Sequence, residues 1–269
     1  MFKLGYYQFR PLFGKVNTNL SKVLKALAPA DADLIVLPEL AFTGYYFSGR
    51  EETLQLAEDP NHSATIDSLL NLCKRRNFYL VTGFAEKKQD KVFNSSILLG
   101  PEGIIHTYRK LHLFSEEKNC FDPGDTPLAL SDVRGAKVGM MVCFDWIFPE
   151  VMRSLTVLGA DIICHPSNLV LSYCQQTMLS RCLENSVFAV TANRFGIDKR
   201  PHGELRFTGK SQIVAPKGVL LQRAPSQRTD LQIHEIDPAL ARNKDITALN
   251  NIMTDRRPEF YSPLCRENN

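Results

Sequence analysis

The stretch Val138-Gly139-Met140-Met141-Val142-Cys143-Phe144-Asp145-Trp146-Ile147-Phe148-Pro149-Glu150 joins a strand to a helix. Its first residues form an apolar run that is typical of a buried strand, and Pro149 suits the first position of a helix. We therefore expect Cys143 on the turn between them, near the positive end of the helix, which would lower the pKa of its thiol. Alternatively, Cys143 is one of several core cysteines, because free cysteine is often buried.

Short apolar runs alternate with longer amphipathic stretches on both sides of this segment, which predicts an α/β fold with a mixed sheet. We expect strands at 3–8, 33–37, 78–84, 92–99, 104–108, 136–142, 161–165, 187–192, 207–214, 219–221 and 229–236, and helices at 17–28, 63–76, 149–158, 173–185 and 238–243. Proline and glycine at 101–103 and 216–218 predict two hairpin turns. No linker rich in glycine, proline or serine divides the chain, so we expect one domain over residues 1–269.

Composition excludes several classes of protein. The chain has 269 residues, 44% hydrophobic and 23% charged, which is ordinary globular composition. A net charge of +3 gives no broad positive field, so we expect no nucleic acid partner. No apolar run approaches the ~20 residues of a membrane span, and the N-terminus lacks the pattern of a secretory signal, so we expect no membrane partner and a cytoplasmic location. The 7 cysteines show no CxxC spacing, which argues against a disulfide framework or a zinc ribbon.

A glutamate follows the apolar run Leu34–Leu37 and Pro38. Proline ends a sheet ladder, so Glu39 is expected where a buried strand opens into a loop. Ligands of open α/β sheets bind beyond the carboxyl ends of strands. A half-buried carboxylate there would have a raised pKa and could act as a base near neutral pH. The alternative is a glutamate that caps backbone or pairs with an arginine.

Basic and aromatic residues alternate in Tyr108-Arg109-Lys110-Leu111-His112-Leu113-Phe114. On a strand, Tyr108, Lys110 and His112 would share one face, and Lys110 could stabilise an oxyanion by its charge. The alternative is a solvated sheet edge that discourages aggregation.

These segments together resemble the nitrilase superfamily, the carbon–nitrogen hydrolases that use a Glu-Lys-Cys triad. The similarity covers nearly the whole chain in the family's order, and the nearest resemblance is to small archaeal and bacterial aliphatic amidases or nitrilases. The matching segments are Leu-Pro-Glu at 37–39, the segments 108–114 and 143–150, Pro-Gly-Asp at 123–125, Gly-Ala-Asp at 159–161, His-Pro-Ser-Asn at 165–168, Arg-Cys-Leu-Glu-Asn at 181–185, Phe-Thr-Gly-Lys-Ser at 207–211 and Pro-Lys-Gly at 216–218.

The resemblance implies roles for particular residues. Cys143 would be the nucleophile, Glu39 the general base, and Lys110, with the backbone N–H of Phe144, the oxyanion stabiliser. The family has a further catalytic glutamate, which falls on Glu117, although the adjacent Glu116 would satisfy a shift of one residue. The implied fold is a four-layer α-β-β-α sandwich. No metal or organic cofactor is implied.

Assembly is also implied by the resemblance. Family members usually dimerise through the helix after the nucleophile and the helix that holds Arg181 and Glu184. We favour a role for these two residues in supporting the interface. The alternative is an i,i+3 surface pair worth a few tenths of a kcal/mol. We expect a homodimer or higher homo-oligomer, with the tail from about residue 245 docking on the partner.

The expected substrate pocket contains Tyr45, Phe144, Trp146 and Asn168. Relatives that hydrolyse N-carbamoyl amino acids carry an arginine where this chain has Trp146, and an indole cannot neutralise a carboxylate. This departure favours small, neutral, partly apolar substrates. Alternatively, Trp146 packs in the core and another residue, such as Arg194, binds an acid.

The chain is thus predicted to be a cysteine-dependent hydrolase of non-peptide C–N bonds, most simply an aliphatic amidase acting through a thioester. A nitrilase that forms a thioimidate and an N-carbamoyl amide hydrolase are alternatives with the same triad. A catalytically silent oligomeric scaffold is an alternative of another class. A zinc site at Cys164 and His165 is disfavoured, because neighbours on a strand point to opposite faces.

Overall fold

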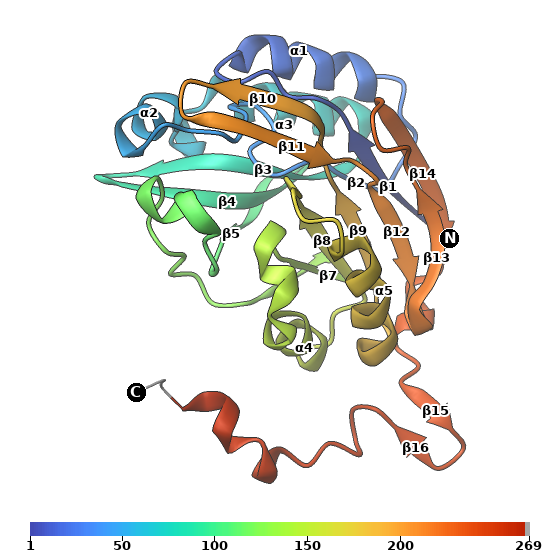
Figure 1. Ribbon diagram of the computed structural model, residues 1–269. Helices are drawn as coiled ribbons and strands as arrows, with labels where there is room; N and C mark the ends of the chain where they lie inside the picture. The colour runs from blue at the N-terminus through green and yellow to red at the C-terminus, as the bar shows by residue number, and fades with distance from the viewer. Residues whose placement is uncertain (267–269) are drawn as a thin grey trace.

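Two six-stranded sheets form the centre of the molecule. The computed structural model describes residues 1–266, and it stacks the two sheets face to face between helices (Figure 1). The first sheet has the order β14 (Asp230–Ile236), β1 (Phe2–Gln8), β2 (Leu34–Val36), β3 (Tyr79–Lys88), β4 (Lys91–Gly100) and β5 (Gly103–Arg109). The second has the order β13 (Val219–Arg223), β12 (Gln212–Ala215), β9 (Phe188–Ala192), β8 (Ile162–Pro166), β7 (Ala136–Met140) and β6 (Leu130–Val133).

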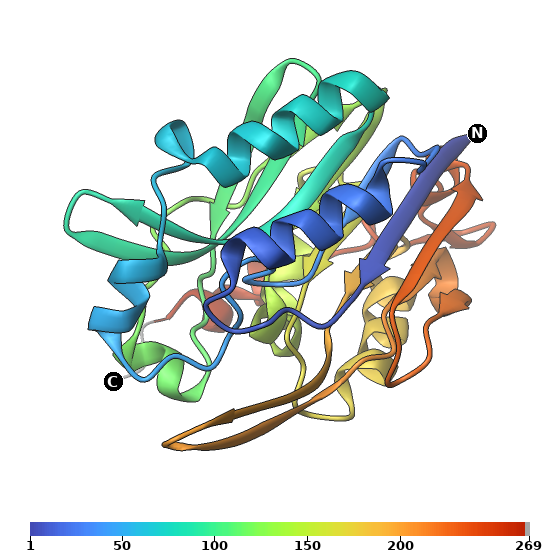
Figure 2. The same ribbon diagram turned by 90° about the horizontal axis from the view of Figure 1, so that it is seen from above.

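Helices cover the outer faces of both sheets. Seen from above, α1 (Val16–Leu27) and α3 (Ala64–Arg76) lie side by side over the first sheet (Figure 2). The second sheet is covered by α4 (Pro149–Val157) and α5 (Cys174–Asn185), which contact each other. The short helix α2 (Arg50–Leu56) lies beside β3. The four-layer α-β-β-α sandwich that the resemblance implied is confirmed.

Parallel pairing places several chain segments at one edge of the sandwich. In the first sheet β1, β2 and β3 run parallel, and in the second β7, β8 and β9 do. The carboxyl ends of β2, β7 and β8 lead into the segments that contain Glu39, Cys143 and Asn168. The fold therefore brings together residues that are far apart in the sequence, at the place where such sheets bind ligands.

Two hairpins lie outside the sheets. One is formed by β10 (Phe195–Arg200) and β11 (Gly203–Thr208), and the other by β15 (Asp245–Thr247) and β16 (Asn250–Asn251). After β15 and β16 the chain runs below α4, apart from the two sheets (Figure 1). The last three residues of the predicted tail lie outside the described part of the chain. No helix among the described residues is long and apolar enough to cross a bilayer.

Candidate active site

Glu39 is held in a closed position at the end of β2. The residue after it, Leu40, has a left-handed backbone with φ 47°. Strand β3 passes so close that a Cβ on Gly83 would lie 2.2 Å from the Glu39 Cα, so only glycine fits there. Glu39 Oε1 accepts hydrogen bonds from Lys110 Nζ at 2.7 Å and from Asn94 Nδ2 at 2.7 Å. Its other oxygen, Oε2, is buried and has no hydrogen-bond partner among the described residues.

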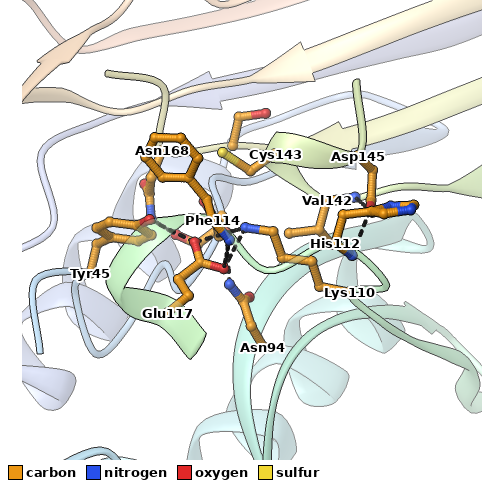
Figure 3. Close-up of polar contacts among 12 residues, drawn as sticks. Tyr45, Asn94, Lys110, His112, Phe114, Glu117, Val142, Cys143, Asp145 and Asn168 are labelled. Carbon is orange, nitrogen blue, oxygen red and sulfur yellow. Dashed lines mark hydrogen bonds and ion pairs between the residues drawn. The ribbon is translucent and has the colours of Figure 1, made fainter. Parts of the chain in front are cut away.

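Lys110 lies between two carboxylates. Its Nζ is 2.7 Å from Glu39 and 2.8 Å from Glu117, and all three side chains are buried. Tyr45 Oη donates to Glu117 Oε1 at 2.6 Å, so that Tyr45, Lys110 and Glu117 converge, with Cys143 facing them (Figure 3). Glu116 is exposed and accepts from Asn119. Of the two neighbouring glutamates, Glu117 is therefore the one that contacts Lys110.

Cys143 begins a short 3-10 turn, Cys143–Ile147, that separates β7 from α4. Its backbone is left-handed with φ 43°, and Asp145 fixes the turn by accepting from the Val142 N–H at 2.9 Å. The Cys143 thiol is buried. Helix α4 begins at Pro149, as the sequence predicts, and the 3-10 turn lies between Cys143 and that helix.

Burial controls the protonation of this cluster. It raises the pKa of the Cys143 thiol well above its usual range, and the nearby Glu39 raises it further, while Lys110 opposes them. This is opposite to the lowered pKa that the sequence predicted. Burial also raises the pKa of Glu39, as predicted, although Lys110 opposes the shift. Burial would lower the pKa of Lys110, but Glu117 and Glu39 outweigh it, so Lys110 stays charged.

The residues at the end of β5 and just after it contact two different groups of side chains. The strand ends at Arg109, so the prediction that Tyr108, Lys110 and His112 share a strand face is wrong. Tyr108 Oη donates to Asp145 at 2.8 Å, and the ring Nδ1 of His112 lies 2.8 Å from the same carboxylate. Only Lys110 reaches the glutamates. Tyr108 and His112, which were predicted to share a face with Lys110, thus contact Asp145, the residue that holds the Cys143 turn.

A small cavity of about 170 Å³ adjoins the cluster. Tyr45 and Glu117 line it, together with Glu116 and four more aromatic residues, Tyr46, Phe47, Phe114 and Phe121. Neither lysine nor arginine is among its lining residues in the described chain. The residues that line the cavity are thus mostly aromatic or apolar, and none of these described residues carries a positive charge.

The other residues predicted to bind substrate have different surroundings. The half-buried ring of Phe144 lies 4.9 Å from that of Phe114. Asn168 donates to the Glu39 carbonyl at 2.8 Å, and its own Oδ1 is buried without a hydrogen-bond partner in the described chain. Trp146 is buried, with its ring edge-on to Tyr173. Its place in the substrate pocket stays a prediction.

Two arginines that the sequence singled out are engaged elsewhere. Arg194 is buried and holds both oxygens of Asp198 at 2.8 Å, so its charge is already paired. Arg181 pairs with Glu184 at 3.1 Å and donates to the backbone carbonyl of Trp146 at 3.3 Å. Arg181 therefore links α5 to the nucleophile turn.

Sequence reasoning missed three buried polar residues near the site. Asn94 contacts Glu39, Asp145 holds the nucleophile turn, and His165 Nε2 lies 2.9 Å from the Cys143 carbonyl. Asn94 stands with Ser95 and Ser96 between apolar residues of the predicted strand 92–99, and this polar interruption is a signal that the sequence offers. Within residues 1–266 no group of three or more His, Cys, Asp or Glu side chains is arranged to hold a metal.

The chain is similar to known proteins along nearly its whole length. The carbon-nitrogen hydrolase family model matches residues 3–244. A protein named nitrilase from Pyrococcus abyssi is 43% identical over 264 residues, covering 97% of this chain and 99% of the relative. An (R)-stereoselective amidase from Pseudomonas sp is 38% identical over 227 residues, covering 82% of this chain and 80% of that protein.

Solved structures agree on the fold. A mutant of the amidase from Nesterenkonia sp. AN1, showing the result of Michael addition of acrylamide at the active site cysteine, matches with a TM-score of 0.81 and 22% identity. The match covers 98% of this chain and 100% of the other. From the family match over residues 3–244 and the 43% identity along almost the full length, the chain belongs to the carbon–nitrogen hydrolases of the nitrilase superfamily, enzymes that act on C–N bonds other than peptide bonds.

Proposed function

We propose that the chain is an amidase that releases ammonia from small neutral amides through a thioester on Cys143. The observation that carries the proposal is the unpartnered, buried Oε2 of Glu39, beside a cysteine and a lysine that is paired with a second glutamate. An unpaired carboxylate oxygen in a closed site is free to accept a proton. The related Nesterenkonia amidase, whose active site cysteine carries an acrylamide adduct, supports a covalent role for the cysteine.

Acylation follows from these positions. Glu39 removes the thiol proton as Cys143 Sγ bonds to the amide carbon, and the carbonyl electron pair moves onto oxygen. Lys110 Nζ and the Phe144 N–H stabilise that oxyanion. When the C–N bond breaks, protonated Glu39 gives its proton to the leaving nitrogen, and ammonia departs.

Deacylation reuses the same base. Glu39 takes a proton from water, the resulting oxygen attacks the thioester carbon, and the C–S bond breaks. The proton on Glu39 then returns to the Cys143 sulfur, so the enzyme is regenerated with no net change. Glu117 keeps Lys110 charged throughout, since it supplies the second carboxylate at 2.8 Å.

The cavity beside Tyr45 and Glu117 supports neutral substrates. A carboxylate bound among its aromatic walls would have no countercharge, and an unpaired charge there costs several kcal/mol. We expect kcat/KM for propionamide to exceed that for N-carbamoyl-β-alanine by at least about a hundredfold, or ~2.7 kcal/mol. Ammonia release from both compounds tests this preference, and a preference for the carbamoyl acid would contradict it.

Nitrile hydrolysis is the second candidate, because the 43%-identical relative is named a nitrilase. The thiol of Cys143 would add to the C≡N bond and form a thioimidate in place of a tetrahedral amide adduct. A matched panel of acetonitrile, propionitrile, acetamide and propionamide with ammonia readout decides between the two. Turnover of the nitriles at more than the rate of the amides would favour the nitrilase.

The described C-terminal segment from residue 245 supports a homodimer as part of the proposal. Its side chains Leu249, Leu264, Phe260 and Ile246 are 91%, 67%, 64% and 52% exposed. Helices α4 and α5 also expose apolar side chains, among them Val157 and Leu183. Apolar surface of this kind is commonly covered by a partner, and a second copy would offer the same faces. Sedimentation velocity tests whether the protein is a dimer.

A further inference from the structure

His165 is a buried titratable residue that the proposed mechanism does not use. It lies on β8, next to the β7 end from which the nucleophile turn begins. Its ring Nε2 is 2.9 Å from the carbonyl oxygen of Cys143, and its Nδ1 is 3.1 Å from Thr191 Oγ1. Both ring nitrogens therefore have partners inside the protein.

The hydrogen bonds define the ring's protonation. A carbonyl oxygen can only accept, so Nε2 must carry the proton toward Cys143. Nδ1 then accepts from the Thr191 hydroxyl, which fixes that tautomer. Burial lowers the pKa of His165 to about 4, so the ring is neutral at ordinary pH and acts as one donor and one acceptor.

The carbonyl that His165 holds belongs to a strained part of the backbone. A left-handed φ of 43° is uncommon for a residue with a side chain, and such positions persist only where the surroundings enforce them. Asp145 holds the Met141–Val142 peptide, one residue before Cys143, by accepting from the Val142 N–H. His165 holds the Cys143–Phe144 peptide directly after the nucleophile, so the backbone is fixed on both sides of Cys143.

The peptide after Cys143 also carries the N–H of Phe144. In a planar trans peptide the C=O and the N–H point in opposite directions. Fixing the Cys143 carbonyl toward His165 therefore fixes the direction of the Phe144 N–H. We propose that His165 is a positioning residue that clamps the Cys143–Phe144 peptide and so aims the Phe144 N–H at the oxyanion, an inference that rests on the proposed amidase chemistry.

Two substitutions of His165 test this proposal, because each replaces the ring by an amide that can occupy the position of only one ring nitrogen. His165→Gln can place its amide near Nε2 and keep a donor for the Cys143 carbonyl. His165→Asn reaches only the Nδ1 position and loses that donor. We expect kcat to fall about 100-fold in the asparagine variant, since loss of one oxyanion donor costs ~10²–10³. The glutamine variant should stay within about tenfold of wild type, and KM should change little in both.

A second readout separates positioning from a general loss of structure. Alkylation of Cys143 by iodoacetamide forms a C–S bond and expels iodide, with no oxyanion, so its rate should change less than about threefold in His165→Asn. The measurement uses a Cys265→Ser background, because Cys265 is an exposed cysteine. Equal losses of alkylation and turnover, or wild-type turnover in the asparagine variant, would overturn the proposal.

Wild-type protein and Cys143→Ala are assayed in parallel. If wild type releases no ammonia from any amide, the proposed function fails, so that failure is distinguishable from failure of the positioning role. The tautomer can be tested in the unaltered protein by NMR of ¹⁵N-labelled histidine at pH 7. We expect the proton of His165 on Nε2, and a proton on Nδ1 would overturn the inference even where the variants do not fold.

Discussion

The catalytic interior and the C-terminal segment from residue 245 show opposite relations between polarity and burial. In the interior, the charged side chains of Glu39 and Lys110 have no exposed surface. In the C-terminal segment, Leu249 is 91% exposed. Charged residues are almost never fully buried unless paired, and exposed apolar patches mark interaction sites. The interior therefore buries charge where we propose catalysis, and the C-terminal segment exposes apolar side chains where we propose a dimer contact.

The two departures differ in their cost to the isolated chain. Removing one member of a buried ion pair leaves an uncompensated charge and typically costs 3–5 kcal/mol. Lys110, shared by Glu39 and Glu117, is such a case. An exposed leucine makes few contacts to lose, so changing it has little effect until a partner covers it. Substitutions in the two regions should therefore differ both in size and in which measurement detects them.

The largest effect is expected at the nucleophile. Cys143→Ala should reduce ammonia release by at least about 10⁴-fold, because no other thiol can form the acyl-enzyme. The fold should survive, since the change removes one sulfur from a buried turn. Ammonia release and the melting temperature check both parts, and mass spectrometry in a Cys265→Ser background should map an alkylator to the peptide containing Cys143. Activity above about a hundredth of wild type would show that Cys143 is not the nucleophile.

The neighbouring glutamates give the next largest contrast. Glu117→Gln keeps an acceptor for Tyr45 but removes one of the two negative charges that hold Lys110, so kcat should fall about 100-fold, as for loss of an oxyanion contact. Glu116→Gln is the matched control, because Glu116 is exposed, accepts a hydrogen bond from Asn119 and makes no ion pair with Lys110. It should change kcat less than about twofold. Similar losses in both variants would remove the distinction between a buried and an exposed carboxylate.

The sequence predicted the residues of the proposed catalytic triad better than the buried polar residues that contact them. Glu39 and Cys143 each follow an apolar run, and Lys110 lies in a run of alternating basic and aromatic residues, so these local patterns are visible without the fold. Asn94 and His165 lie inside strands, and their contacts with distant residues arise only when β4 meets β2 and the turn after β7 meets β8. The raised pKa of Cys143 was missed for the same reason, because burial by other segments outweighs local backbone dipoles.

Most strands and long helices agree with the sequence-based expectation to within a few residues, and the errors have identifiable causes. The predicted strand 207–214 is broken because Gly209 and Lys210 are left-handed, and a Cβ on Gly209 would meet the Ser226 carbonyl at 2.1 Å. The predicted helix 238–243 is a short 3-10 turn, Pro238–Ala241. Helix α2 was missed because seven residues are too few for a clear apolar period. The C-terminal elements were missed because they are shorter still.

A smaller effect is expected on the free energy of unfolding when the pH is lowered and His165 is protonated in the unfolded chain. Its pKa is about 4 in the folded protein and near 6.5 when unfolded, so between these values only the unfolded chain binds the proton. This contribution to stability is present above pH 6.5 and is lost as the pH falls toward 4, by about 3 kcal/mol at 1.36 kcal/mol per pKa unit.

Urea unfolding of wild type and His165→Gln at pH 7 and pH 4.5 isolates this contribution. The free energy of unfolding of wild type should fall by about 2 to 3 kcal/mol more than that of the variant. Carboxylates elsewhere titrate in both proteins and cancel in the difference. Equal falls in the two proteins would show that His165 is not held neutral by burial.

The smallest effect on the isolated chain is expected in the C-terminal segment. Leu249→Ser should change the free energy of unfolding of the monomer by less than about 0.5 kcal/mol, because a surface substitution breaks few contacts. If a second copy covers Leu249, the dimer loses the burial of a leucine side chain, worth about 1.5–3 kcal/mol, and its Kd rises about 10- to 100-fold. Leu12→Ser is the control, since Leu12 is also exposed but lies before α1, in the opposite helical layer. Sedimentation velocity over a dilution series should show weaker association for the first variant and wild-type association for the second. A monomeric wild type, or an unchanged Kd in Leu249→Ser, would mean that Leu249 lies in no dimer interface. The exposed apolar side chains of the C-terminal segment would then have no function comparable to that of the buried charges.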